Sequence, residues 1–305
     1  MTTAEAALPE PPPDPQRLVY LGTPEFAVAP LRAVVEAGYE VTLVVSRADA
    51  RRGRGRGLTP SPVKAAALDL GLPVSDRVDD VAAVGADLGV VVAFGRLIRP
   101  NVLAALPLVN MHFSLLPRWR GAAPVERAIL AGDERTGVDL MVVEEGLDTG
   151  GIYARAEVAI DEDETADDLR ARLTTLGTVL LVDRLADGFP PPQPQDGEAT
   201  YAHKIEPAEL HVDWSSPAVH IHRLVRVGGA WTTFRGKRLK LWRTRLAHDT
   251  DHDADTPPGR DEGIVRPTGD GHLLLLDVQP EGKQRMPATA WANGVRLGDD
   301  EPLGT

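Results

Sequence analysis

Short runs of apolar and β-branched residues set the pattern of the N-terminal half of this chain. They cover residues 18–21, 41–45 and 88–93, and segments with helical spacing of apolar residues lie between them. A continuous apolar run suits a strand buried on both faces, as in a parallel sheet covered by helices. Ser61 and Pro62 supply an N-cap and a first-turn proline for a helix over residues 61–70. The pattern predicts a layered α/β domain.

Composition divides the chain into four parts. Residues 1–15 are rich in Pro, Ala and Glu and predict a disordered tail. The α/β pattern fills residues 16–188, and the Pro-rich residues 189–205 predict a stiff, extended linker. Residues 206–305 contain a helical pattern and short strands divided by Gly, Pro and Asp, which favour a small β-barrel; the expected elements are a helix at 217–227 and strands at 237–242, 263–266 and 273–278.

Overall composition is typical of a soluble globular protein, with 43% hydrophobic and 26% charged residues in a chain of 305. Cysteine is absent, which excludes disulfides and thiolate metal ligands and fits a reducing compartment. The apolar run at residues 88–94 is far shorter than the roughly 18 residues that span a bilayer. We therefore expect a cytoplasmic protein with no membrane partner.

An amide, an imidazole and a hydroxyl alternate after the apolar residues 106–109. They belong to Asn110, His112 and Ser114, which would share one face of a strand. Asp148 follows in a Gly-Leu-Asp-Thr-Gly segment. Any one of these residues alone is more often a satisfied polar strand end, but the combination indicates a site.

These groups suit acyl transfer. An Asn amide donates to an oxygen that becomes negative as a carbonyl is attacked, and a His stabilises that charge or moves a proton near neutral pH. Asp148 would orient the imidazole of His112 or stabilise its protonated form. Asn110, His112 and Asp148 are thus the predicted catalytic residues.

The pattern Asn-x-His-x-Ser-Leu-Leu-Pro at residues 110–117, with Asp148 downstream, resembles the folate-dependent formyltransferases. The continuation Arg-Trp-Arg-Gly-Ala-Ala-Pro at residues 118–124 is similar to the members that act on methionyl-tRNA. The resemblance covers about residues 17–290. It implies a Rossmann-like formyltransferase domain with a parallel-rich sheet, followed by a small C-terminal OB-like β-barrel.

The resemblance also implies substrates. The formyl group of 10-formyltetrahydrofolate would pass to the α-amino group of methionine on initiator methionyl-tRNA, with no metal. The turn formed by Ser114, Leu115, Leu116 and Pro117 would hold the folate through its backbone, and Phe94 would supply an apolar wall together with Leu97 and residues 141–143. Arg118 and Arg120 would meet either the folate glutamate or the tRNA. We expect a monomer.

The net charge of -12 does not exclude a tRNA partner, because a phosphate interacts mainly with the charges close to it and salt screens those further away. Residues 47–56 are rich in Arg and Gly, and the resemblance implies that this loop, with Arg52, Arg54 and Arg56, reaches the acceptor end of the tRNA. Residues 223–245 hold eight Lys or Arg and no Asp or Glu. This segment is either a barrel face with buried aromatic residues and outward cations or a phosphate-binding surface, and both can be true at once. Lys237 and Arg238 belong to it and are predicted to bind nucleic acid.

Several alternatives compete with this hypothesis. Gly22 lacks the two further glycines of a dinucleotide-binding turn, which argues against a nicotinamide or flavin enzyme. Residues 248–255 are rich in His and Asp, but a solvated loop is favoured over a metal site there. Formyl transfer to an amino sugar or a purine precursor would not require the basic segments. A nucleic-acid-binding barrel without catalysis would not require Asn110, His112 and Asp148 together.

Overall fold

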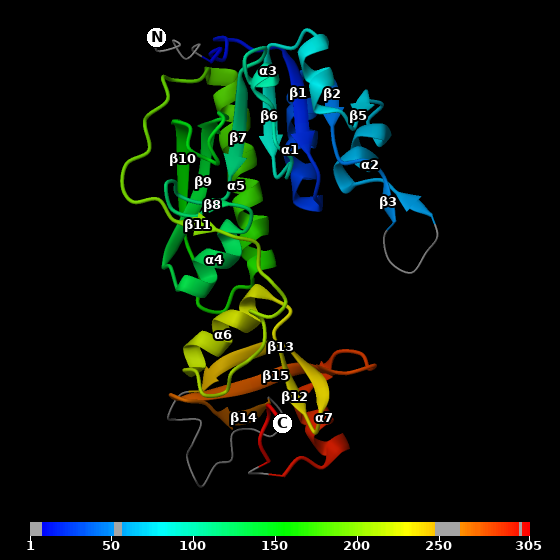
Figure 1. Cartoon of the computed structure of the whole chain (residues 1–305), viewed down its shortest axis with the longest axis vertical. Helices are drawn as coiled ribbons and strands as arrows, with labels where there is room; N and C mark the ends of the chain where they lie inside the picture. The colour runs from blue at the N-terminus through cyan, green and yellow to red at the C-terminus, as the bar shows by residue number, and fades with distance from the viewer. Residues whose placement is uncertain (1–7, 52–56, 248–262, 299–300) are drawn as a thin grey trace, which may run out of the picture. The chain divides into compact units, whose positions relative to one another are not determined.

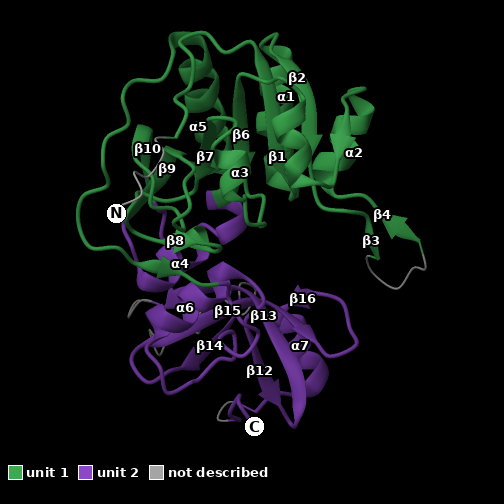
Figure 2. Cartoon of the chain, turned by 45° about the horizontal axis from the view of Figure 1, so that its top comes forward, with its two compact units in different colours: residues 1–125, 135–159, 170–203 green, residues 126–134, 160–169, 204–305 purple. Residues whose placement is uncertain are grey.

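The structure is a computed structural model that describes residues 8–51, 57–247, 263–298 and 301–305. The chain forms two compact units, which are coloured separately in Figure 2. The first contains residues 1–125, 135–159 and 170–203. The second contains residues 126–134, 160–169 and 204–305, so that short segments of the N-terminal half belong to it. None of the helices in the described ranges is long and apolar enough to cross a membrane.

A seven-stranded sheet forms the centre of the first unit, in the order β10-β9-β7-β6-β1-β2-β5 (Figure 1). Its parallel strands are β1 (Arg17–Gly22), β2 (Glu40–Val45), β5 (Val74–Ser75), β6 (Leu88–Val92) and β7 (Leu108–His112). Two antiparallel strands extend it beyond β7, namely β9 (Arg135–Val142) and β10 (Ile152–Ala159). The predicted Rossmann-like domain with a parallel-rich sheet is confirmed.

The chain changes direction within this sheet between β1 and β6. After β1 it builds outward through β2 and β5, and it then returns to the other side of β1 for β6 and β7. In open α/β sheets, ligands bind outside the carboxyl ends of the strands at such a switch point. The topology therefore predicts a ligand site among the loops that follow β1, β6 and β7.

Helices connect these strands, and one of them, at Pro100–Leu103, was not predicted from the sequence. They are α1 (Val28–Glu36), α2 (Pro62–Asp69), α3 (Pro100–Leu103), α4 (Pro124–Ala131) and α5 (Ala166–Asp187), with 3-10 turns at Glu25–Ala27 and Val78–Ala83. The hydroxyl of Ser61 accepts a hydrogen bond from the Lys64 amide at 3.1 Å, which confirms the predicted N-cap. Short ladders join β3 (Ala50–Arg51) to β4 (Leu58–Thr59) and β8 (Arg120–Gly121) to β11 (Tyr201–Ala202).

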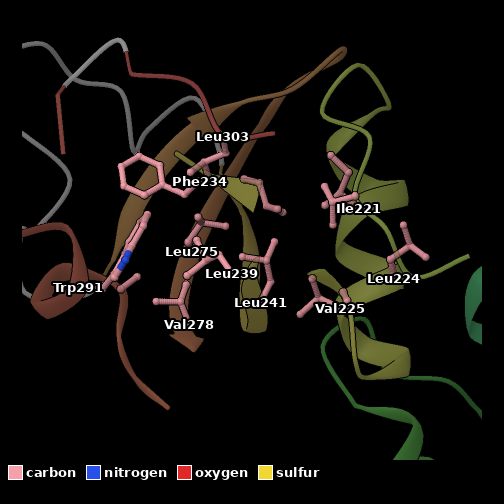
Figure 3. Close-up of a cluster of buried hydrophobic side chains, with 14 residues drawn as sticks. Ile221, Leu224, Val225, Phe234, Leu239, Leu241, Leu275, Val278, Trp291 and Leu303 are labelled. Carbon is pink, nitrogen blue, oxygen red and sulfur yellow. The ribbon is translucent and has the colours of Figure 1, made fainter. Parts of the chain in front are cut away.

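The second unit contains a five-stranded antiparallel sheet that curls into a half-barrel. Its strands are β12 (Trp231–Phe234), β13 (Lys237–Ala247), β15 (His272–Pro280) and β14 (Ile264–Pro267) in that order, with β16 (Met286–Pro287) paired to β15. Irregularities in β13 near Arg243 bend the sheet. Side chains from α6 (Ala218–Val227), from the sheet and from α7 (Ala288–Val295) converge in one apolar cluster around Leu239 and Leu241 (Figure 3).

Sequence reasoning missed β12 and α7. The strand has only four residues between Gly-Gly and Arg-Gly, too few to show a clear period. The helix carries Thr289 and Gly294, which weaken its intrinsic propensity. Burial of Ala288 and Trp291 against the sheet compensates for that weakness, which is a tertiary effect that a local pattern does not contain.

Helix α6 binds the turn that precedes α5, which is also part of the second unit. His222 is 4% exposed and has its Nδ1 2.9 Å from the Thr244 hydroxyl and its Nε2 3.2 Å from the Glu162 carbonyl. One turn later, Arg226 donates to the carbonyls of Asp161 and Glu164 at 2.8 and 2.9 Å. Burial lowers the pKa of His222, and the hydrogen bond to Glu162 opposes that effect only in part.

The lowered pKa of His222 predicts that this unit loses stability in mild acid. The unfolded chain takes up a proton on this histidine near pH 6.5, whereas the folded protein does so only at lower pH, so stability falls as the pH drops below about 6.5. His222→Gln should flatten this dependence in urea unfolding at pH 7.5 and 5.5. His220→Gln, on the exposed side of the same helix, is the matched control and should retain the parental slope.

An ion pair between a buried carboxylate and an arginine that is 42% exposed joins β9 and β10. Asp139 is 0% exposed, and its two carboxylate oxygens accept from Arg155 Nε and Nη2 at 2.7 Å each. The same carboxylate accepts the Leu116 amide at 2.8 Å, while Arg155 Nη2 donates to the Leu116 carbonyl at 2.6 Å. The pair therefore holds both polar groups of the Leu116 residue, in the turn that follows β7.

Removing the charge of Asp139 should be costly. Asp139→Asn removes the charge that accepts from Arg155 and from the Leu116 amide, and we expect the free energy of unfolding to fall by about 2 kcal/mol. The loss is limited because the Arg155 side chain is 42% exposed and keeps water around it. The ion pair of Arg135 with Glu157 lies on the same two strands but is exposed, so Glu157→Gln should cost less than about 1 kcal/mol. If chemical denaturation gives the two variants equal losses in the free energy of unfolding, the ion pair of Asp139 with Arg155 stabilises the fold no more than the exposed pair does.

Candidate active site

The structure brings the predicted catalytic residues together at the carboxyl edge of the sheet. Asn110 and His112 lie on β7, where Asn110 is aligned with Val91 of β6 and Met141 of β9. Asp148 lies in the loop between β9 and β10 and approaches His112, with 3.6 Å between His112 Nδ1 and Asp148 Oδ2. Asp148 thus joins a site with two residues that lie 36 and 38 positions before it in the sequence.

One part of the strand prediction is wrong. β7 ends at His112, so Ser114 lies beyond the strand and does not continue the face shared by Asn110 and His112. Ser114 is fully buried, and its hydroxyl donates to the Arg118 carbonyl at 2.6 Å. This hydrogen bond closes a tight turn over residues 114–118. The alternation of side chains between the two faces of the sheet stops at His112, because the backbone leaves the sheet there.

Both nitrogens of His112 have defined surroundings. The ring is 5% exposed, with Nε2 2.9 Å from the Trp119 carbonyl oxygen. A carbonyl can only accept, so Nε2 carries a proton and Nδ1 is the nitrogen that can gain or lose one. Nδ1 is the atom that faces Asp148. The ring is therefore oriented so that a proton moves on the side of the carboxylate.

Asp148 is held in place by backbone contacts. Its Oδ2 accepts the Gly121 amide at 2.8 Å, and its side chain is 16% exposed. Gly121 has φ of +122°, and a Cβ there would lie 3.0 Å from the Ala202 carbonyl oxygen, so a larger residue does not fit. The Arg-Gly sequence after Trp119 thus supplies an amide that fixes the carboxylate.

Unfavourable backbone conformations gather at this site. In the described part of the first unit, the non-glycine residues with positive φ are Ala93, Trp119 and Asp148, at +48°, +63° and +50°. Ala93 directly follows β6, and the other two contact His112. Such conformations persist where surrounding contacts enforce them, and they are concentrated at functional sites.

The predicted folate turn is rigid. Leu115 is partly exposed, Leu116 is 2% exposed and bound by the ion pair described above, and Pro117 follows through a cis peptide bond. The backbone of this turn is held at Leu116 by hydrogen bonds to Asp139 and Arg155. Sequence reasoning missed Asp139 and Arg155, although an Asp inside the apolar run of residues 138–143 was a visible signal.

The residues of the predicted apolar wall differ in how far they are exposed. Phe94 is 5% exposed and belongs to a buried hydrophobic cluster, and its carbonyl oxygen is 3.3 Å from the Thr23 hydroxyl in the loop after β1. Leu97, by contrast, is 79% exposed. A cavity of about 420 Å³ opens beside it, lined by Arg77, Val78, Asp79, Arg96, Leu97 and Arg99. Leu97 therefore presents more surface to a ligand than Phe94 does.

The predicted nucleic-acid contacts are described only in part. Arg52, Arg54 and Arg56 lie outside the described residues, as do residues 248–255. Lys237 and Arg238 are exposed at the start of β13, and the Arg238 guanidinium lies 4.2 Å from the centre of the Trp231 ring. No group of three or more His, Asp or Glu that could hold a metal occurs in the part of the chain that the structure describes.

Comparison with known proteins agrees with the fold. Residues 16–185 match the family "Formyl transferase", and residues 204–296 match "Formyl transferase, C-terminal domain". A methionyl-tRNA formyltransferase of Heliobacterium modesticaldum is 43% identical over 92% of this chain and 98% of its own length. One from Acidothermus cellulolyticus is also 43% identical, over 92% of this chain and 98% of that protein.

Solved structures share the fold at lower identity. A methionyl-tRNA formyltransferase from Clostridium thermocellum has a TM-score of 0.55 at 16% identity and covers 76% of this chain and 94% of its own. An N-formyltransferase from Helicobacter canadensis, in complex with folinic acid and dTDP-3-aminofucose, has a TM-score of 0.61 at 17% identity and covers 87% and 99%. The resemblance inferred from residues 110–124 is confirmed: the chain belongs to the formyl transferase family and contains both its N-terminal and its C-terminal domain.

Proposed function

We propose that this protein transfers the formyl group of 10-formyltetrahydrofolate to the α-amino group of methionine on initiator methionyl-tRNA. The observation that carries this proposal is the contact between His112 and Asp148 beside Asn110, at the carboxyl end of β7 and next to the strand that borders the switch point. Relatives with 43% identity over both domains are named methionyl-tRNA formyltransferases. Residues 16–188 would carry the chemistry, and residues 206–305 would bind tRNA.

The turn over residues 114–117 suits a folate ring. Leu115, Val142 and Val143 are partly buried and Leu97 is exposed, so apolar surface remains available beside a backbone that the Asp139 and Arg155 pair holds fixed. Ser114, Leu115, Leu116, Pro117 and Phe94 remain the proposed folate contacts. Ser114 and Phe94 are buried, so these two would act through their backbones or through packing behind the ring.

The reaction needs an oxyanion donor and a path for protons. The amine attacks the formyl carbon, a C–N bond forms, and the formyl oxygen becomes negative until the bond to the folate nitrogen breaks. Asn110 donates to that oxygen, and His112 carries a proton on Nδ1 that stabilises the same charge. Asp148 balances the charged ring and takes part in moving the proton from the attacking amine to the departing nitrogen.

The catalytic assignment predicts a large loss on removing the Asn110 amide. Asn110→Ala should slow turnover by about 10²- to 10³-fold, the usual effect of removing one oxyanion donor. Asn101→Ala, an exposed asparagine of α3, is the control and should retain parental turnover. If Asn110→Ala keeps near-parental turnover while folding normally, this residue does not stabilise the transition state.

The acceptor is tested by direct comparison. Formylation should be measured with charged initiator tRNA, with an amino-sugar nucleotide and with glycinamide ribonucleotide as acceptors, each with 10-formyltetrahydrofolate. The proposal expects efficient transfer only to the charged tRNA. Preference for either small acceptor would overturn it, because those are the substrates of the competing hypothesis.

The basic segment over residues 223–245 contains cations in different situations. Arg226 is buried against backbone carbonyls, while Arg235 pairs with Glu301 and Arg243 pairs with Asp277. Along the described chain, no carboxylate forms an ion pair with Lys237, Arg238 or Lys240. We propose that these three cations, here called the β13 cations, contact tRNA together with Arg52, Arg54 and Arg56.

Aromatic side chains accompany the β13 cations. Trp231 is aligned with Lys240 across the β12–β13 pair and lies under Arg238, and Trp242 is 41% exposed on β13. Exposed rings beside cations provide both stacking and charge for a nucleic acid. The outer side of β12 and β13 is therefore the proposed tRNA surface of the second unit.

A matched pair of variants tests this surface. Arg238→Ala should weaken binding of charged tRNA and reduce the slope of log Kd against log salt by about 0.9 if the lost contact is to a duplex phosphate. Arg243→Ala, on the same strand but paired with Asp277, should change the slope less. Filter binding between low and physiological salt measures both. Identical slopes for Arg238→Ala and the parent would remove Arg238 from the interface.

A further inference from the structure

The segment after α5 lies against the active site and belongs to the first unit. We call residues 193–202 the strap; they lie between the ranges matched by the two formyl transferase families, 16–185 and 204–296. Gln193 pairs with Ile152 of β10, and β11 runs parallel to β8. The Thr200 carbonyl accepts the Arg120 amide at 2.9 Å. The strap is thus joined by backbone hydrogen bonds to the segments on both sides of the site.

Gln195 of the strap holds the loop that carries Asp148. Its Nε2 donates to the carbonyls of Asp148 and Gly150, both at 2.8 Å. Its Oε1 accepts from Arg120 Nε and Nη2 at 3.1 and 2.7 Å. Each polar atom of this side chain is therefore used, and two of its bonds fix the backbone on either side of Thr149. Asp148 has a positive φ, so its orientation depends on such external contacts.

Thr200 of the strap holds the residue that orients His112. Its Oγ1 accepts the Trp119 amide at 2.9 Å, and the Trp119 carbonyl oxygen lies 2.9 Å from His112 Nε2. Trp119 also has a positive φ, at +63°. One residue of the strap therefore supports each member of the His112–Asp148 pair.

We propose that the strap is a positioning element for catalysis, with Gln195 setting the place of Asp148 and Thr200 setting the place of His112. The inference rests on the proposed function for the role of the pair. The two side chains are 3.6 Å apart, and a displacement of about 1 Å in such a contact can reduce the rate by about 10²-fold. Neither positioning residue needs to touch a substrate to have this effect.

Two glutamines of the strap provide a matched test of Gln195. Gln195→Met keeps the length of the side chain and removes its four hydrogen bonds, and we expect kcat to fall by about 10- to 10²-fold with an unchanged KM for folate. Gln193→Met removes only a local side-chain bond to the Pro191 carbonyl and should behave like the parent. Equal kcat in Gln195→Met and Gln193→Met would overturn the role of Gln195.

Thr200 is tested by a conservative pair in the full-length protein. Thr200→Val removes the hydroxyl that accepts the Trp119 amide and should lower kcat, whereas Thr200→Ser keeps an acceptor and should restore it. Loss of activity in both variants, or in neither, would contradict the inference.

A second readout does not depend on the acceptor. The NMR signals of the His112 ring, assigned with His112→Gln, should move in Gln195→Met and Thr200→Val and stay in place in Gln193→Met and Thr200→Ser. A simple loss of stability would lower the melting temperature without moving these signals in the folded protein. Unmoved ring signals in Gln195→Met and Thr200→Val would overturn the inference, even if the protein formylates tRNA. Moved signals without formylation of tRNA would instead contradict the proposed function alone.

Discussion

Strand β9 is the element on which both the proposed catalytic residues and the proposed folate turn depend. It pairs with β7, where Asp139 is aligned with His112 and Met141 with Asn110, and it pairs with β10 through Asp139 and Arg155. Burying a carboxylate is unfavourable unless its oxygens are bonded, and here Arg155 and the Leu116 amide bond them. The register of one strand therefore fixes Asn110, His112 and the turn at Leu116 at the same time.

The sequence predicted those parts of the fold that depend on residues close together in the chain. The structure contains the predicted buried strands at residues 18–21, 41–45 and 88–93 and the predicted N-cap at Ser61. A continuous apolar run favours a buried strand, and a serine before a proline favours the start of a helix, whatever the rest of the chain does. The alternation of Asn110 with His112 was correct as far as the strand continues, and it failed at Ser114 because sequence periodicity does not mark where β7 leaves the sheet.

The remaining site residues depend on contacts that sequence spacing does not encode. Gln195 reaches Asp148 across 47 positions, and Thr200 reaches Trp119 across 81. A proline-rich composition indicates an extended backbone, and it says nothing about what that backbone lies against. The same limit applies to charge: eight cations in residues 223–245 look equivalent in the sequence, and only the fold separates Arg243, with its carboxylate partner, from Arg238.

The position of the strap has a consequence for the order in which the protein becomes complete during synthesis. The ribosome makes the chain from its N-terminus, so β7, the loop with Asp148 and α5 all exist before residues 193–202 do. The Asp148 loop gains its side-chain contacts from the strap only when Gln195 has left the exit tunnel, and Trp119 gains its contact only when Thr200 has done so. A nascent chain that ends at α5 therefore contains Asn110, His112 and Asp148 without the hydrogen bonds from Gln195 and Thr200, and these contacts form only just before residues 204–305 are made.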